Sequence, residues 1–187
     1  YENIDLGIEN ICAGDVVIIN GPIGNHGMTL MCQREEIHVD TPLQSDCASL
    51  NGIIGKLIDK VPEVKFFRDP TRGGVAMILN EIAENTGLSV EIFEDDLPID
   101  PQVQSAADIL GFDVLNIANE GKFISIVPEN KSEVFIKECK KHPLGKKAVI
   151  IGKIGKAEEN NFVEMITEVG GRRIIRKPYG RELPRIC

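Results

Sequence analysis

The stretch "VKFFRDPTRGGVAMILNEIAENTGLSVEIF", residues 64–93, decides the fold because its hydrophobic pattern changes twice within a short distance. The apolar run at 64–69 predicts a strand, and apolar residues then recur at helical spacing from Gly73 to Thr86, before Gly87. Residues 88–93 alternate in polarity, which predicts a second strand. A strand, a glycine-rich turn, a helix and another strand in succession indicate helices packed on a sheet.

The same two patterns fill the rest of the chain. Several strands lie close enough in sequence to form hairpins, which favours an α+β fold with a mixed or largely antiparallel sheet over a doubly wound parallel one. We expect further strands at 14–20, 122–128, 148–155, 161–168 and 172–177, and further helices at 28–35, from an N-cap at Ser45 to a stop at Pro62, at 101–111 and at 130–142.

The composition is that of one globular domain, or of a domain with a small appendage: 187 residues, 42% hydrophobic and 27% charged. No apolar run is long enough to span a membrane and the start does not resemble a signal peptide, so we expect a cytoplasmic protein. The net charge of −8 argues against general nucleic-acid binding. Residues 172–187 nevertheless hold six basic residues and one acid, a segment that could dock on the body, on an acidic partner or near a phosphate, or stay solvated.

The five cysteines give no sign of a zinc site or a disulfide framework, because they form no CxxC pair and their number is odd. We expect four of them to be small core or helix-face residues: Cys12, Cys32, Cys47 and Cys139. The fifth, Cys187, is the last residue. An exposed terminal thiol oxidises easily, so either the chain simply stops there or the sulfur has a function.

The segment "RDPTRGG", residues 68–74, is the first candidate site. A strand is expected to end at Asp69 and a helix to start near Gly73, with Thr71 as a possible cap. The free N–H groups of a helix start attract anions, and the guanidinium of Arg72 suits a phosphate. Asp69 could cap the helix or pair with a neighbouring arginine. The same residues also fit a well-capped helix with a tight entry, and they do not form a Walker A loop.

The turn Asn119-Glu120-Gly121 is the second candidate site. Burial between apolar segments could raise the pKa of Glu120 and make it a base near neutral pH, although a Glu-Gly pair is often only a turn. The glycine-rich segment 21–27 is weaker. His26 in it could be a general base, a phosphate donor or, as we favour, a turn histidine.

Taken together, "GDVVIINGPIGNHGMTLM", "FFRDPTRGGVAMILNEIA", "LNIANEGKF" and the ending "PRIC" resemble the HypE family of hydrogenase maturation enzymes. This family belongs to the superfamily of aminoimidazole ribonucleotide synthetase (PurM), selenophosphate synthetase and thiamine-phosphate kinase. The resemblance covers essentially the whole chain and implies a PurM-like C-terminal domain at 1–177 and a flexible tail at 178–187. It also implies that the phosphate end of a nucleotide cleft is lined by Asp69, Thr71, Arg72, Gly73, Gly74 and Asn119.

The resemblance further implies an activity. A partner carbamoyltransferase, HypF, would load a carbamoyl group onto Cys187. ATP and Mg2+ would then be used to dehydrate the S-carboxamide to an S-thiocyanate, with Glu120 as the base. The cyanide would pass to iron on a HypC–HypD scaffold for [NiFe]-hydrogenase, and family members are often homodimers.

Two features depart from the family pattern. The ATP-binding half that carries the magnesium ligands would precede residue 1, and no cluster of aspartates suited to magnesium is found in this sequence. We therefore expect a C-terminal fragment that is inactive alone. "IGNHG" replaces the more usual "IGDHG", so Asn25 lacks a charge. The alternatives are a selenophosphate-synthetase-like or kinase-like ATP-dependent enzyme domain, and a non-catalytic thiol carrier or docking module.

Overall fold

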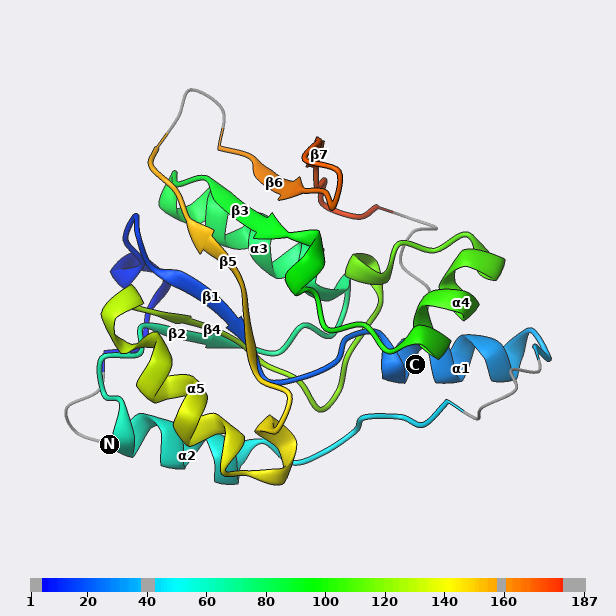
Figure 1. The fold of residues 1–187 in the computed structure, drawn as a ribbon, viewed down its shortest axis with the longest axis horizontal. Helices are drawn as coiled ribbons and strands as arrows, with labels where there is room; N and C mark the ends of the chain where they lie inside the picture. Colours follow the sequence, from blue (N-terminus) through cyan, green and yellow to red (C-terminus); the bar gives the residue numbers. More distant parts are fainter. Residues whose placement is uncertain (1–4, 38–42, 158–160, 180–187) are drawn as a thin grey trace.

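A computed structural model describes residues 5–37, 43–157 and 161–179 of the chain, and these contain one seven-stranded sheet (Figure 1). The strand order is β2-β4-β1-β5-β3-β6-β7, and every neighbouring pair is antiparallel except β3 and β6. This confirms the α+β fold with a mixed, largely antiparallel sheet. The strands are β1 Val16–Ile19, β2 Phe66–Arg68, β3 Val90–Phe93, β4 Ile124–Val127, β5 Val149–Ile154, β6 Val163–Ile166 and β7 Arg172–Ile174.

The hairpins expected from strand spacing are mostly wrong. Among the strands in the described ranges, only β6 and β7 are consecutive in sequence and paired with each other. The central strand β1 instead pairs with β4 and β5, which lie far away in sequence. Most of the sheet is therefore held by long-range pairing, for which a local pattern gives no signal.

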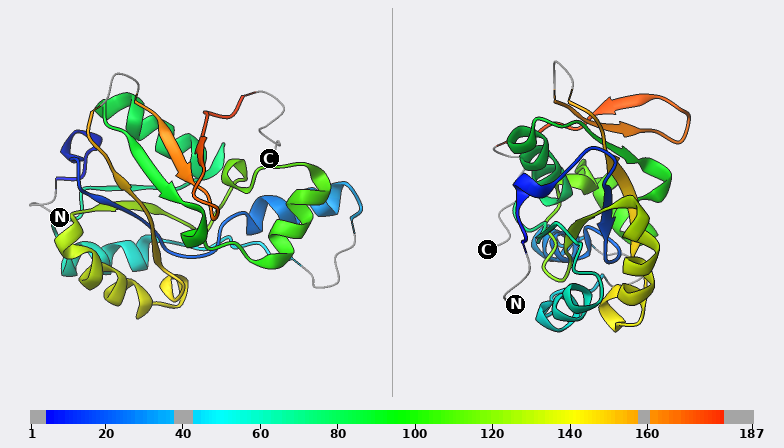
Figure 2. Two further views of the ribbon diagram at one scale, coloured as in Figure 1. Left: turned by 45° about the horizontal axis from the view of Figure 1, so that its top comes forward. Right: turned by 90° about the vertical axis from the view of Figure 1, so that its left-hand side faces the viewer.

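Helices cover both faces of the sheet (Figures 1 and 2). On β1, Val16 and Ile18 point into a core shared with α2 and α5, while Val17 and Ile19 point into the opposite core with α3. Because both faces are covered, all four residues of β1 are buried. The helices are α1 Asn25–Arg34, α2 Asn51–Lys60, α3 Gly74–Thr86, α4 Pro101–Leu110 and α5 Ser132–Lys140.

Each predicted helix is present, but α1 and α2 begin three or more residues from the expected position. The helix α1 begins at Asn25, after Gly24 in the left-handed conformation (φ 83°), and not at residue 28. The helix α2 begins at Asn51, so Ser45 is not its N-cap. The stop signals were read correctly at Gly87 and Gly111, which both have positive φ.

Much of the basic segment after residue 171 docks on the body of the protein. Arg172 pairs with Glu164, Arg173 with Asp113 and Lys177 with Glu84, at 2.7–2.8 Å. Pro178 is buried, and a Cβ on Gly73 would lie 3.2 Å from its Cγ. The chain thus returns from β7 to the start of α3. Residues 180–187, with Cys187, lie outside the described residues.

Across the ranges that the structure describes, no helix has both the length and the apolar character needed to cross a bilayer.

Candidate active site

Three loops that carry the sequence motifs meet at the side chain of Asn119. Its Oδ1 accepts a hydrogen bond from the N–H of Gly24 at 2.8 Å, and its Nδ2 donates to the carbonyls of Pro70 at 3.1 Å and Ile117 at 2.9 Å. The N–H of Asn119 also donates to the carbonyl of Pro70, at 3.0 Å. Asn119 is completely buried, so this amide joins the segment 21–27, the segment 68–74 and its own turn.

A second buried amide, Asn20, holds the other side of the same turn. Its Oδ1 accepts from the N–H of Phe123 at 2.8 Å, and its Nδ2 donates to the carbonyls of Gly121 at 3.2 Å and Leu144 at 2.9 Å. Sequence reasoning missed Asn20. The available signal was a polar residue directly after a buried apolar strand, because such a side chain needs hydrogen-bond partners inside the fold.

The start of α3 is built from two glycines with positive φ, Gly73 (77°) and Gly74 (59°). A Cβ on Gly74 would overlap the carbonyl oxygen of Leu115 and lie 2.6 Å from that of Ile117. The second glycine is therefore required by the close approach of the short 3-10 helix η3, Val114–Asn116, and not only by an open helix start. Thr71 does not cap α3 with its side chain. Its carbonyl accepts from the N–H of Gly74 at 3.1 Å.

Asp69 and Arg72 are both exposed on this loop. Within the described residues, Asp69 forms no ion pair with Arg68 or Arg72, and Arg68 instead faces Glu81 at 3.7 Å. The pairing suggested for Asp69 is therefore not found. An exposed guanidinium beside a helix start remains an arrangement that suits a phosphate.

The side chain of Glu120 is exposed, so the burial expected for it is wrong. Its backbone is nevertheless held on both sides, by Asn119 and by Gly121, whose carbonyl accepts from Asn20. The turn therefore presents a carboxylate on a fixed backbone.

A segment of irregular structure, residues 43–50, crosses this turn; we call it the strap. Asp46 in the strap pairs with Lys122 at 2.8 Å, and Ser45 Oγ shares a hydrogen bond of 2.8 Å with Nδ1 of His26. These contacts explain why Ser45 caps no helix. His26 lies in the first turn of α1 and binds the strap, so the expectation of a turn histidine was also wrong.

Asn25 lies at the edge of the same region, where the more usual family pattern has an aspartate. Its Nδ2 donates to Oδ2 of Asp100 at 3.1 Å, and Lys147 pairs with the other oxygen of Asp100 at 2.9 Å. Burial would raise the pKa of Asp100, but the hydrogen bonds from Lys147 and Asn25 outweigh burial and hold that pKa below its ordinary value. The ionic contact at this loop is thus made by Asp100 and Lys147.

The four cysteines that the structure describes fall into two classes. Cys32 and Cys139 are buried as expected, and burial raises the pKa of Cys139 to about 12. Cys12 and Cys47 are exposed, which corrects the expectation of core or helix-face positions. Among the residues that the structure describes, no three His, Cys, Asp or Glu side chains gather as metal ligands would.

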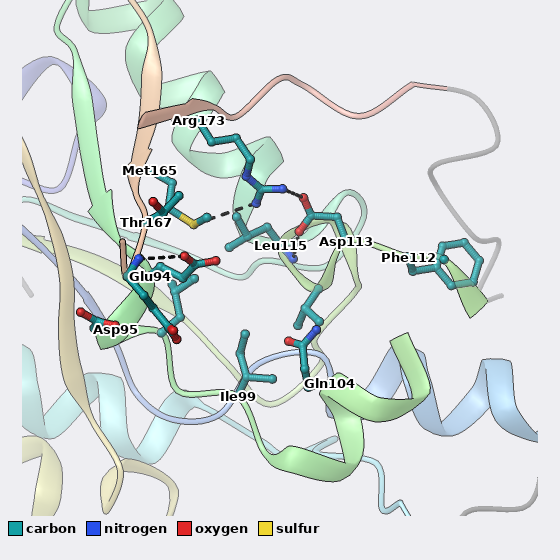
Figure 3. A pocket seen from close by; sticks show the side chains of 14 residues that line it. Glu94, Asp95, Ile99, Gln104, Phe112, Asp113, Leu115, Met165, Thr167 and Arg173 are labelled. Atoms are coloured by element: carbon teal, nitrogen blue, oxygen red, sulfur yellow. Dashed lines mark hydrogen bonds and ion pairs between the residues drawn. The ribbon is translucent and has the colours of Figure 1, made fainter. Parts of the chain in front are cut away.

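A hollow of about 800 Å³ lies away from these loops, between η3 and the β6–β7 hairpin (Figure 3). Asp113 there accepts from Arg173 at 2.8 Å, and Glu94 accepts from the N–H of Glu168 at 3.0 Å. Glu94, Asp113 and Arg173 thus serve contacts within the protein. None of the site residues predicted from the sequence lines it.

Comparison with known families now places the chain in a class. Residues 13–164 match the family model "AIR synthase related protein, C-terminal domain", and the chain belongs to that family. Thiamine monophosphate kinase from Aquifex aeolicus shares the fold at a TM-score of 0.58, with 15% identity over 90% of this chain and 54% of the kinase.

Within this superfamily, the chain is more similar in sequence to HypE proteins. The carbamoyl dehydratase HypE of Rhizobium leguminosarum bv. viciae is 40% identical over 187 residues, which is 100% of this chain and 53% of that protein. HypE of Escherichia coli K12 is 40% identical over 185 residues, 99% of this chain and 54% of that protein. The resemblance to the HypE family is thus confirmed, and the chain spans about half the length of these relatives.

Solved HypE structures agree. A HypE–HypF complex matches with a TM-score of 0.90 and 42% identity, over 95% of this chain and 57% of that one. A HypE structure in complex with ATP matches with a TM-score of 0.90 and 35% identity, over 97% and 55%.

Proposed function

We propose that this chain is the C-terminal domain of a HypE-type carbamoyl dehydratase, which makes the cyanide ligands of [NiFe]-hydrogenase. The observation that carries the proposal is the buried amide of Asn119, which holds the three motif loops together. Relatives about 40% identical that bear the name carbamoyl dehydratase support it. In this proposal residues 1–177 form the domain and 178–187 a tail that carries Cys187.

The reaction removes one water from a carboxamide bound to the sulfur of Cys187. ATP supplies a phosphoryl group, which turns the amide oxygen into a phosphate leaving group. The two N–H protons depart, and the carbon–nitrogen triple bond of a thiocyanate remains. We assign proton removal to Glu120, because a carboxylate on a fixed turn can be placed within hydrogen-bond reach of those protons.

The tail is long enough to serve this site. Pro178 packs beside Gly73, so the proposed tail begins next to the loop 69–74. The nine residues that follow Pro178 could span about 30 Å when extended. Cys187 could therefore reach both Glu120 and a separate partner enzyme.

We propose two roles for the residues at the ATP phosphates. Asp69, Thr71, Arg72, Gly73 and Gly74 would face the phosphates, whereas Asn119, already saturated by backbone groups, would position the loops. Mg2+ would be held mostly by the N-terminal half of the full-length protein. The 187 residues alone should therefore bind ATP weakly and dehydrate nothing.

We infer the partners from the relatives. The solved HypE–HypF complex supports HypF as the carbamoyl donor. The HypC–HypD scaffold as cyanide acceptor, a homodimer of the full-length protein and a cytoplasmic location complete the proposal.

The test is Glu120→Gln in the full-length protein, followed by intact mass after incubation with HypF, carbamoyl phosphate and ATP. We expect carbamoylation of Cys187 to persist and the later loss of water to slow by about 100-fold or more. Glu133→Gln, an exposed glutamate on α5, is the control and should change neither step. If dehydration is unchanged in Glu120→Gln, Glu120 is not the base. If the wild type itself loses no water, a thiol carrier or a different ATP-dependent enzyme becomes the better account.

A further inference from the structure

The carboxylate of Asp46 contacts the Glu120 turn at two points. Its Oδ2 lies 2.8 Å from Nζ of Lys122, and its Oδ1 accepts a longer hydrogen bond, 3.4 Å, from the N–H of Glu120. One side chain of the strap therefore spans the turn from Glu120 to Lys122.

This ion pair is buried. The side chain of Asp46 is 8% exposed and that of Lys122 is 11% exposed. Burying two charges costs desolvation energy that their attraction barely repays, so such a pair contributes little net stability but tolerates little displacement of either partner. The pair therefore matters more for fixing the positions of Asp46 and Lys122 than for the free energy of folding.

Backbone packing fixes the strap in the same place. A Cβ on Gly121 would overlap the carbonyl oxygen of Asp46 and lie 3.3 Å from the Cβ of Ala48. The bond between Ser45 and His26 holds the strap to α1 as well. The strap thus cannot slide along the turn without breaking several contacts.

By contrast, the exposed carboxylate of Glu120 forms no hydrogen bond or ion pair within the described part of the chain, and its backbone N–H bonds to Asp46. The direction of this side chain consequently depends on the orientation of the turn. We propose that Asp46 and Lys122 are positioning residues that orient Glu120 toward the carboxamide. This inference rests on the proposed role of Glu120 as the base.

The test compares variants of Lys122 in the full-length protein by the single-turnover rate of water loss. Lys122→Met should lower the rate by about 100-fold, the effect of a displaced catalytic group, and leave the KM for ATP unchanged. Lys122→Arg retains a cation for Asp46 and should retain most of the rate. In a Glu120→Gln background, Lys122→Met should add less than a further twofold or so, because both changes then act on the same group.

A matched control separates positioning from general destabilisation. Lys65 and Asp15 form a similar pair at 2.9 Å, with 21% and 6% exposed side chains, at the start of β1. Lys65→Met should destabilise the fold to a comparable degree without slowing water loss in the folded fraction. Where Lys122→Met folds poorly, hydrogen exchange of the wild type and of Asp46→Asn gives a second measurement. The rate of amide hydrogen exchange at residues 119–122 should be at least about tenfold higher in Asp46→Asn than in the wild type.

The outcomes distinguish this inference from the proposed function. If water loss is slow in Glu120→Gln but has the wild-type rate in Lys122→Met, only the positioning role is overturned. A fully active Glu120→Gln overturns the base assignment and this inference with it. A Lys65→Met variant as slow as Lys122→Met, or unchanged exchange at 119–122 in Asp46→Asn, also rejects the positioning role.

Discussion

Asn119 shows how much of the candidate site depends on one side chain. Its amide satisfies backbone groups of three loops, which are also joined by the backbone bonds from Asn119 to Pro70 and from Gly27 to Ala118. The sequence motif "NEG" identifies this residue but not its partners. Sequence alone suggested direct contact with a cofactor, whereas the hydrogen bonds favour a role in holding the loops.

We expect Asn119→Ala to lower the free energy of unfolding by about 3 kcal/mol, because the buried N–H of Gly24 and the carbonyl of Ile117 lose their side-chain partner. Urea unfolding measures this change. Asn85→Ala, which removes one exposed bond to the carbonyl of Glu81, should stay within about 0.5 kcal/mol of the wild type. Equal effects of the two variants would show that the Asn119 contacts do not stabilise the loops.

Asp100 gives the protein a pH dependence whose sign can be stated. Its folded pKa is below the ordinary 3.8 because Lys147 and Asn25 outweigh burial. The stabilisation is therefore present above pH 3.8 and is lost as the pH falls through the folded pKa. Asp100→Asn should lower the Tm at neutral pH, and this difference should shrink toward about pH 3. Asp100 occupies the N-cap position of α4 without a side-chain cap bond, and asparagine is equally suited to that position, so a difference that is independent of pH would contradict the assignment.

At the scale of elements, the sequence predicted what is local. Apolar periodicity identified each helix and strand, and glycines marked the ends of α3 and α4. The sheet order and the strap could not be predicted, because they depend on contacts such as Asp46 with Lys122 that join residues 76 positions apart. The same contacts override local signals, as at Ser45, which binds His26 instead of starting a helix.

Two glycines in helices should respond in opposite directions to alanine. Gly74→Ala should destabilise the fold by at least about 2 kcal/mol, since its φ is positive and its Cβ would meet the carbonyls of Leu115 and Ile117. Gly52, on the exposed face of α2, has open space around it, and Gly52→Ala should stabilise by about 0.5–1 kcal/mol. Thermal unfolding measures both changes. A Gly74→Ala variant as stable as the wild type would contradict the close approach of η3 to α3.

For the whole molecule, the uneven charge noted in the sequence has a structural basis. Three basic residues beyond residue 171 pair with acids on the body, and Pro178 then packs beside Gly73. Residues 172–178 are thus anchored to the body, and they end beside the loop that we assign to the ATP phosphates. This placement, which sequence alone left open among several alternatives, supports a tail that begins at the candidate site.

The most direct test of the central claim is the intact mass of this chain and of the full-length protein after incubation with HypF, carbamoyl phosphate and ATP, with the adduct located by peptide mapping. We predict a carbamoyl group on Cys187 in both, followed by loss of one water in the full-length protein alone. An absence of any adduct on Cys187 in both proteins would contradict the carrier role of the terminal thiol and with it the proposed dehydratase.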